Sequence, residues 1–133
     1  MPSVLIDTHI LIWWRSDPPR LSPRQAHILK DLEAQGRPAS ISAVSLRELA
    51  LLGSRGRLEI SAPWDLWLEE LADHPMFDIL PLTPRIAAES VRLGPDFPKD
   101  PADQIIAATA RCHGLPLLTA DAHIRRWGGV RII

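Results

Sequence analysis

Short apolar runs alternate along the chain with longer segments in which apolar residues recur every three or four positions. Runs that are short, apolar and rich in β-branched residues are typical of strands buried in a parallel sheet. We expect strands at residues 3–6, 39–42, 77–80 and 115–119, and a last one at 130–133. Because helical segments separate these runs, the pattern predicts an α/β fold. Its mostly parallel sheet of four or five strands should be covered by helices on both faces.

Side chains that cap helices mark where the intervening helices begin. Ser22-Pro23 and Asp100-Pro101 each place an N-cap residue before a proline at the first helical position. Gly36 and Gly114 suit the left-handed conformation that often ends a helix. The segment 94–99 is rich in proline and glycine, so we expect a loop there. The predicted helices cover residues 10–14, 23–35, 43–53, 63 onward, 84–93, 101–113 and 121–127.

The composition is that of an ordinary globular protein. The 133 residues suit one domain, and apolar residues make up 46% of them while charged residues make up 23%. No apolar run approaches the roughly 18 residues that span a bilayer, and the first residues do not look like a signal peptide. Cys112 is the only cysteine, so no internal disulfide can form. We therefore expect a cytoplasmic protein in which residues 1–133 form a single domain.

Two aspartates follow predicted strands. Asp7 comes directly after Val4-Leu5-Ile6, and Asp121 comes two residues after the 115–119 run, where Thr119 is placed to face the same cleft. In parallel α/β sheets, ligand sites form beyond the carboxyl ends of the strands, so both aspartates are candidates for a functional role. The alternative for each is a plain N-cap for the helix that follows, which is a common use of aspartate.

Two further acids lie within helices on faces that should be buried. Glu48 lies in a helix that is apolar on all sides apart from Arg47 and Glu48 itself, which indicates a largely buried helix. Asp103 shares the apolar face of the 101–113 helix, which we expect to pack on the sheet. A buried carboxylate is costly unless it is paired or bound to a metal. The alternatives are an arginine pair for Glu48 and a favourable helix-dipole interaction for Asp103. Asp100 is interpreted as the N-cap that supports Asp103.

Together, these acids predict a site for a hard cation. Carboxylates that crowd at one sheet edge repel one another, and a bound divalent cation removes that repulsion. Oxygen ligands without a histidine or cysteine cluster suit Mg²⁺ or Mn²⁺ rather than zinc. The five histidines lack zinc spacing and are interpreted as mostly surface residues, with His9 nearest to the site. The formal net charge of −1 is unlike a protein that binds nucleic acid by bulk charge, although a bound cation would mask several acids.

Five stretches of the chain carry a further signal through their order. They are VLIDTHILIWW at 4–14, ISAVSLRELALLGSRGRLEI at 41–60, LPLTPRIAAESVRL at 80–93, DPADQIIAATARCHGLPLLTAD at 100–121 and GGVRII at 128–133. Together they resemble PIN-domain ribonucleases, and more closely the VapC-type toxins of bacterial toxin–antitoxin pairs. The resemblance covers nearly the whole chain. It implies a PIN-like three-layer α/β/α fold.

The resemblance also implies a metal-dependent ribonuclease that cleaves tRNA or ribosomal RNA and so inhibits translation. The residues that it carries over as catalytic acids and ligands of Mg²⁺ or Mn²⁺ are Asp7, Glu48, Asp103 and Asp121. Thr8 and Thr119 match polar positions beside the site. Two positions depart from the family pattern: Gln104 stands where arginine is common, and Arg47 stands where an aromatic residue is common.

The partners implied by the resemblance are RNA, a small VapB-like antitoxin that blocks the cleft, and further copies in a homodimer or a larger toxin–antitoxin oligomer. The pairs Trp13-Trp14 and Trp64/Trp67 would suit such interfaces, because aromatic residues are enriched at interface anchors. Their alternative is core packing. Lys99 is a candidate for contact with substrate phosphate, and its alternative is ordinary solvated surface.

Three other functions fit parts of the sequence. A haloacid-dehalogenase-like phosphatase also has an aspartate after its first strand, but it would need a second aspartate where His9 stands and a catalytic lysine. A non-catalytic PIN-like binding module would normally lack one or more of the four acids, and all four are present. A PIN nuclease of RNA processing, without an antitoxin, differs little from a toxin at the level of the sequence.

Overall fold

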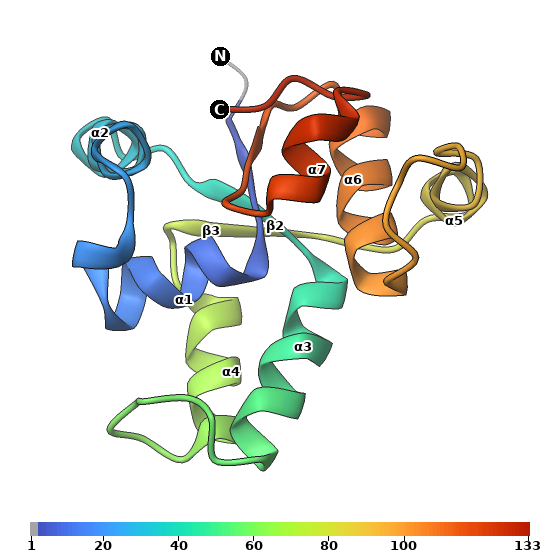
Figure 1. Cartoon of the computed structure of the whole chain (residues 1–133). Helices are drawn as coiled ribbons and strands as arrows, with labels where there is room; N and C mark the ends of the chain where they lie inside the picture. The colour runs from blue at the N-terminus through green and yellow to red at the C-terminus, as the bar shows by residue number, and fades with distance from the viewer. Residues whose placement is uncertain (1–2) are drawn as a thin grey trace.

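The computed structural model describes residues 3–133 and has a central sheet surrounded by helices (Figure 1). Within these residues, four strands form the sheet in the order β3-β2-β1-β4, and every neighbouring pair is parallel. The strands are β1 Leu5–Ile6, β2 Ala39–Ser42, β3 Phe77–Leu80 and β4 Leu117–Leu118. The first four predicted strands are confirmed, although β1 and β4 are shorter than expected. Their parallel order follows from the helical crossovers that join them.

Seven α-helices and one short 3₁₀ helix connect these strands within the described residues. They are α1 Thr8–Ser16, η1 Pro18–Arg20, α2 Pro23–Ala34, α3 Ala43–Ser54, α4 Trp64–Asp73, α5 Pro84–Ser90, α6 Pro101–His113 and α7 Ala122–Trp127. The predicted start of α2 is confirmed in detail. Ser22 Oγ accepts from the backbone N–H of Gln25 at 3.1 Å, and the Gln25 side chain accepts from the backbone N–H of Ser22 at 2.9 Å.

The sheet carries one hydrophobic cluster on each face, which makes three layers. Along β1 and the residue before it, Val4 and Ile6 belong to one cluster and Leu5 to the other, as the alternation of side chains along a strand requires. Residues of α1, α2, α3 and α4 complete the first cluster, and residues of α6 and α7 complete the second. In Figure 1, α2 and α6 accordingly lie on opposite sides of the strands. The predicted α/β/α arrangement is confirmed.

The end of the chain differs from the prediction. We expected a strand at 130–133, but this segment makes a single isolated parallel bridge, between Ile132 and Leu117. The backbone N–H of Leu117 donates to the carbonyl of Arg131 at 2.8 Å, and its carbonyl accepts from the N–H of Ile133 at 3.0 Å. The strand β4 is itself only two residues long, so the edge that it presents to this segment is short. The prediction of a fifth strand is therefore wrong.

Helix α3 is less buried than its apolar composition indicates. Within it, Ser45 and Leu49 are fully buried, whereas most of its other apolar side chains are half-buried. Its neighbour α4 likewise leaves Trp64 37% exposed and Leu66 51% exposed. Arg47 and Ser54 are the exposed residues of α3, so the prediction of a largely buried helix is confirmed in part. Apolar side chains left open in this way are typical of a surface that another protein covers.

The strand order determines which residues meet at the carboxyl edge of the sheet. Asp7 leaves β1, and Thr119 leaves β4, which is the direct neighbour of β1. Backbone pairing continues to this point, since the N–H of Asp7 donates to the carbonyl of Leu118 at 3.0 Å. Ser42 ends β2 on the other side of β1 and caps α3. Among residues 3–133, none of the helices combines the length and apolar character needed to cross a bilayer.

Candidate active site at the carboxyl edge of the sheet

The carboxylate of Asp7 is held from two sides. It is 5% exposed; Oδ1 accepts from the backbone N–H of Thr8 at 2.7 Å, and Oδ2 accepts from the Thr119 hydroxyl at 2.7 Å. Burial raises the pKa of Asp7 above its ordinary value, although these two hydrogen bonds lower it. The charge of Asp121 raises the pKa further. Asp7 is therefore a buried acid with a fixed orientation, and it is also the N-cap of α1.

A row of hydroxyls links α1 to α3 beside Asp7. The Thr8 hydroxyl donates to Glu48 Oε1, and its oxygen lies 2.9 Å from the Ser45 hydroxyl oxygen. Because Thr8 has one hydroxyl hydrogen and gives it to Glu48, Ser45 is the donor in the second hydrogen bond. Burial raises the pKa of Glu48, the Thr8 hydrogen bond lowers it, and the charge of Asp7 raises it. Among residues 3–133, the salt bridges do not include Glu48, so its predicted alternative as an arginine partner is not observed.

Helix α6 brings Asp103 to the same edge. The apolar face of this helix is buried, as predicted, and Asp103 itself is half-buried. Burial raises the pKa of Asp103, and the charges of Asp7, Asp100, Asp121 and Glu48 bring it to about 7. All four of those carboxylates therefore act electrostatically on one side chain. The four acids singled out in the sequence lie together with Asp100, and we call these five residues the acid cluster.

Besides Asp7, two further members of the acid cluster cap helices. Asp100 Oδ1 accepts from the backbone N–H of Ala102 at 2.8 Å and of Asp103 at 3.2 Å, which confirms its predicted capping of α6. Asp121 Oδ1 accepts from the N–H of His123 at 2.8 Å and of Ile124 at 3.0 Å. The capping interpretation of Asp121 is therefore correct as well. Capping uses Oδ1 of Asp121 and leaves Oδ2 available to bind a ligand.

A small cavity opens over Asp7. It has a volume of about 190 Å³ and is lined by Asp7, His9, Trp13, Ala120 and Asp121. His9 is exposed and lines this cavity, as expected for the histidine nearest to the site. The volume lies below the range of about 300–1,000 Å³ that is usual for small-molecule sites. The cavity suits a hydrated ion and a phosphate group better than a whole nucleotide.

The acid cluster fits a partly hydrated cation. Within residues 3–133, no three histidine, cysteine, aspartate or glutamate side chains converge closely enough to hold one ion by themselves. Mg²⁺ commonly keeps several waters and is bound by one or two carboxylates, so it does not need such a cage. Burial is the main cause of the raised pKa values of Asp7, Glu48 and Asp103, and the charges of neighbouring acids raise each of them further. A bound cation would relieve that repulsion. The donors therefore match Mg²⁺ or Mn²⁺.

Ser45 is the site residue that the sequence did not reveal. It is completely buried and lies three positions before Glu48, on the same side of α3. This spacing was the available signal, but a serine in the first turn of a helix is common and carries no chemical signature. Its role follows from its hydrogen bond to Thr8, which lies far away in the sequence.

The remaining candidates lie around the acid cluster. Lys99 is exposed and directly precedes Asp100. Trp13 lines the small cavity, whereas Trp14 packs edge-on against Phe77 with 5.5 Å between ring centroids. Gln104, which departs from the family pattern, donates from its side chain to the carbonyl of Pro98 at 3.3 Å. Arg47, the other departure, is exposed.

The site and fold agree with one family. The sequence pattern of the PIN domain matches residues 4–130. The chain belongs to the PIN-domain family. It is 37% identical to Ribonuclease VapC22 of Mycobacterium tuberculosis over 125 residues, which is 94% of this chain and 92% of the relative.

Solved structures with the PIN fold resemble the chain over nearly all of its length. A DNA-bound VapBC from Salmonella typhimurium superimposes with a TM-score of 0.73 at 22% identity, covering 100% of this chain and 98% of that one. A toxin–antitoxin complex from Klebsiella pneumoniae superimposes with a TM-score of 0.62 at 26% identity, covering 98% and 96%. Membership of the PIN family excludes the dehalogenase-like phosphatase that the first strand alone allowed.

Proposed function

We propose that this PIN domain is a ribonuclease toxin that needs Mg²⁺ or Mn²⁺, cleaves RNA phosphodiester bonds to inhibit translation, and is neutralised by a VapB-like antitoxin. The observation that carries the proposal is the acid cluster. Burial and the charges of the other members raise the pKa of Asp103 to about 7 at the edge of the sheet where parallel α/β folds place their sites. Two similarities support it: a relative named as a VapC ribonuclease, and a structure solved as a toxin–antitoxin complex.

Asp7 and Asp103 are the most direct ligands in this proposal, and Glu48 and Asp121 complete the shell, partly through water. When bound, the cation supplies charge stabilisation for the phosphoryl transition state and promotes ionisation of a water molecule. The protein's own contribution is orientation. Thr119 and the backbone of Thr8 hold the two oxygens of Asp7 in place, and their hydrogen bonds favour its charged form. The hydroxyl of Thr8 holds Glu48 in the same way.

Cleavage of a labelled RNA by purified protein tests this assignment. With Mg²⁺ present, Asp7→Asn and Asp103→Asn should each lower the cleavage rate at least about a hundredfold, since each removes a ligand charge while keeping the shape of the side chain. Asp65→Asn, at an exposed position at the start of α4, is the matched control and should cleave normally. Circular dichroism checks that each variant folds.

Two results would count against the proposal. Cleavage at the wild-type rate by Asp7→Asn or Asp103→Asn would remove the acid cluster from the reaction. A wild-type protein that cleaves no RNA under any divalent cation would favour the non-catalytic binding module. Sequencing of RNA ends after brief expression, with Asp7→Asn as the control, would show whether tRNA or ribosomal RNA is cut.

The antitoxin and the oligomer form a separate part of the proposal. The half-buried apolar side chains of α3 and the exposed Trp64 and Leu66 of α4 support a protein partner on this side of the molecule. Expression together with the protein encoded next to this chain should give a stable complex in size-exclusion chromatography with light scattering. A strict monomer at high concentration, without a co-purifying protein, would instead support an RNA-processing nuclease.

A further inference from the structure

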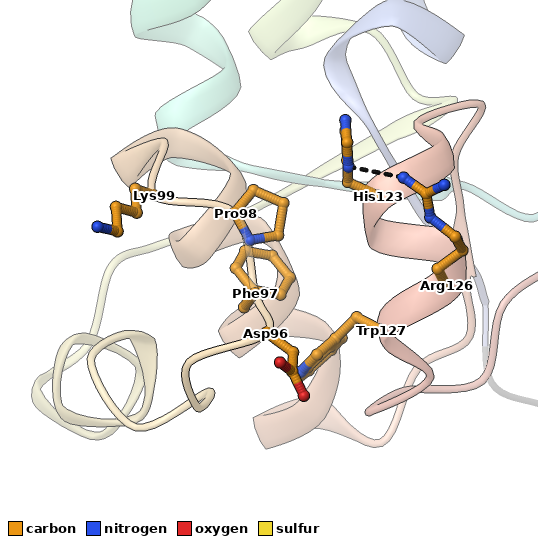
Figure 2. A pocket seen from close by; sticks show the side chains of 7 residues that line it. All are labelled: Asp96, Phe97, Pro98, Lys99, His123, Arg126 and Trp127. Atoms are coloured by element: carbon orange, nitrogen blue, oxygen red, sulfur yellow. Dashed lines mark hydrogen bonds between the residues drawn. The ribbon is translucent and has the colours of Figure 1, made fainter.

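A second and larger cavity lies next to the acid cluster. Its volume is about 520 Å³, within the range of about 300–1,000 Å³ that is usual for small-molecule sites. Figure 2 shows its two walls: the segment that contains Phe97 and Pro98 on one side, and His123, Arg126 and Trp127 of α7 on the other. We call it the flanking pocket. The cavity over Asp7, at about 190 Å³, is too small for a whole nucleotide. The flanking pocket is large enough to hold one.

We propose that the flanking pocket binds one nucleotide of the RNA substrate, adjacent to the phosphodiester that is cleaved. This inference rests on the ribonuclease function proposed above and adds to it the place where the substrate is held. Its phosphate lies against Arg126 and His123, and its base lies between the apolar side chains of Phe97, Pro98 and Trp127, which come from both walls.

Both walls of the flanking pocket are tied to the acid cluster. On one wall, the backbone N–H of His123 donates to the carboxylate of Asp121 at 2.8 Å. On the other wall, Lys99 directly precedes Asp100, whose carboxylate accepts from the backbone N–H of Asp103 at 3.2 Å. The residues that line the pocket are therefore sequence neighbours of Asp121 on one wall and of Asp100 on the other. A nucleotide in the pocket would lie beside the acid cluster.

The charges at this place favour a phosphate. The acid cluster repels polyanions, and the net charge of −1 provides no general attraction for RNA, so a local cation is needed. The guanidinium of Arg126 lies 2.9 Å from His123 Nδ1. Arginine can only donate, so Nδ1 is the acceptor, and the neutral ring carries its hydrogen on Nε2. Among residues 3–133, the salt bridges do not include Arg126, which leaves its charge for an external anion.

The apolar side chains that line the flanking pocket are held by contacts and hydrogen bonds. Phe97 and Trp127 meet edge to face with 4.8 Å between ring centroids, and Trp127 Nε1 donates to the carbonyl of Leu93 at 3.1 Å. The side chain of Gln104 fixes the facing segment by its hydrogen bond to the carbonyl of Pro98. Single-stranded RNA is commonly recognised through bases that pack on fixed aromatic side chains. Gln104, one of the two residues that depart from the family pattern, thus helps to build the pocket of this chain.

The two ends of the flanking pocket differ in charge, which orients the nucleotide. Asp96 is the only acid among the lining residues, and in Figure 2 its carboxylate lies at the Trp127 end, away from His123. Lys99 points away from α7 in the same view. A phosphate is therefore repelled from the Asp96 end and attracted to the Arg126 and His123 end.

The test measures RNA binding and cleavage separately. Fluorescence anisotropy with a short, labelled, single-stranded RNA of mixed sequence, in EDTA, gives a Kd that does not depend on catalysis. Arg126→Gln should raise this Kd about tenfold, as expected for loss of a phosphate contact. Asp96→Asn should lower it about twofold by removing repulsion. Arg24→Gln, an equal charge change at an exposed position of α2 that lines none of the cavities described here, should leave it unchanged.

In cleavage assays with Mg²⁺, Arg126→Gln should raise KM about tenfold and change kcat by less than about twofold. An unchanged Kd for Arg126→Gln, or an equal rise for Arg24→Gln, would overturn the proposal, and so would a loss of antitoxin binding with RNA binding intact. If the wild-type protein fails to cleave RNA while its Kd still depends on Arg126, the ribonuclease function fails and the pocket stands. If the wild-type protein cleaves RNA and the Kd is unchanged by Arg126→Gln, only the proposal for the flanking pocket is contradicted.

Discussion

The two sides of the acid cluster are built on different principles. On the strand side, Asp7 is 5% exposed and receives hydrogen bonds from Thr8 and Thr119, which hold it in one orientation. On the helix side, Asp103 is half-buried, and within the described residues its carboxylate has no hydrogen bond. Burial and the neighbouring acids raise the pKa of Asp103 to about 7. One side supplies a rigid ligand, and the other supplies negative charge that a cation has to balance.

The difference shows how one site meets two requirements. A ligand is oriented most reliably by groups at the ends of strands, because the sheet fixes their backbone. Charge is gathered most easily by a helix that starts at the same edge, because its first turn tolerates acids. The predictions below test each side in turn.

The largest expected effect is on the strand side, through Thr119. Thr119→Val keeps the shape of the side chain but removes the hydrogen bond to Asp7 and leaves the backbone N–H of Asp121 without its acceptor. We expect a loss of about 1–3 kcal/mol in the free energy of unfolding and at least a tenfold lower cleavage rate. Urea denaturation and the RNA cleavage assay measure the two effects.

Thr109→Val is the matched control. Thr109 is as buried as Thr119, but its hydroxyl donates to the carbonyl of Ile105 within α6, which keeps its helical hydrogen bond in the variant. This variant should lose clearly less stability and cleave normally. Equal losses in both variants would mean that Thr119 matters only as a packed side chain, and the strand side would not be special.

An intermediate effect is expected on the helix side, from pH and metal. Folded protein without metal keeps the proton of Asp103 up to a pH of about 7, against an ordinary pKa of 3.8. The folded state therefore binds more protons than the unfolded chain between these values, and its stability falls as the pH rises through that window. Thermal unfolding in EDTA should show this fall, and Mg²⁺ should raise Tm by a few degrees more at pH 8 than at pH 5.

The variant Asp103→Asn should make this pH dependence less steep, although Asp7 and Glu48, whose pKa values are also raised, keep part of it. It should also reduce the stabilisation by Mg²⁺. Asp65→Asn, at an exposed position of α4, should behave as the wild type does. If the melting temperature in EDTA rises between pH 5 and pH 7, or if Mg²⁺ stabilises Asp103→Asn as strongly as the wild type, the charge on the helix side is not what the cation balances.

The smallest effect is expected from Ser45, which contacts the acid cluster only indirectly, through its hydrogen bond to the Thr8 hydroxyl. Ser45→Ala removes the donor to Thr8 but leaves the hydrogen bond from Thr8 to Glu48 in place. We expect a loss of about 0.5–1.5 kcal/mol in the free energy of unfolding and a cleavage rate lowered by a few-fold. A rate lowered as strongly as in Asp7→Asn would show that Ser45 contacts the substrate instead.

Residues next to strand ends and helix starts could be placed from the sequence because local patterns determine them. Asp7 follows an apolar run, and Asp100-Pro101 has the form of a helix start, so both positions agree with the structure. The neighbourhood of Asp7 and Asp121 depends on the pairing of β1 with β4. The order of elements along the chain does not contain this pairing; the sequence indicated only that both aspartates follow strands at the same edge of a parallel sheet.

The features missed in the sequence depend on contacts between distant segments. The hydrogen bonds that join Ser45, Thr8 and Glu48 need α1 and α3 to approach, and the flanking pocket needs α7 to face the segment 94–99. The strand expected at 130–133 failed for a related reason. Residues 130–133 pair with β4, which is two residues long, through a single bridge between Ile132 and Leu117.

Binding of Mn²⁺ to the metal-free protein tests the central claim most directly, namely that acids from both sides form one cation site. Isothermal titration calorimetry at pH 7.5 should show binding by the wild-type protein, weakened at least about tenfold by both Asp7→Asn and Asp103→Asn. Asp96→Asn, in the flanking pocket, should bind as the wild type does. Unchanged affinity in both Asp7→Asn and Asp103→Asn, or an effect of only one of them, would contradict a shared site.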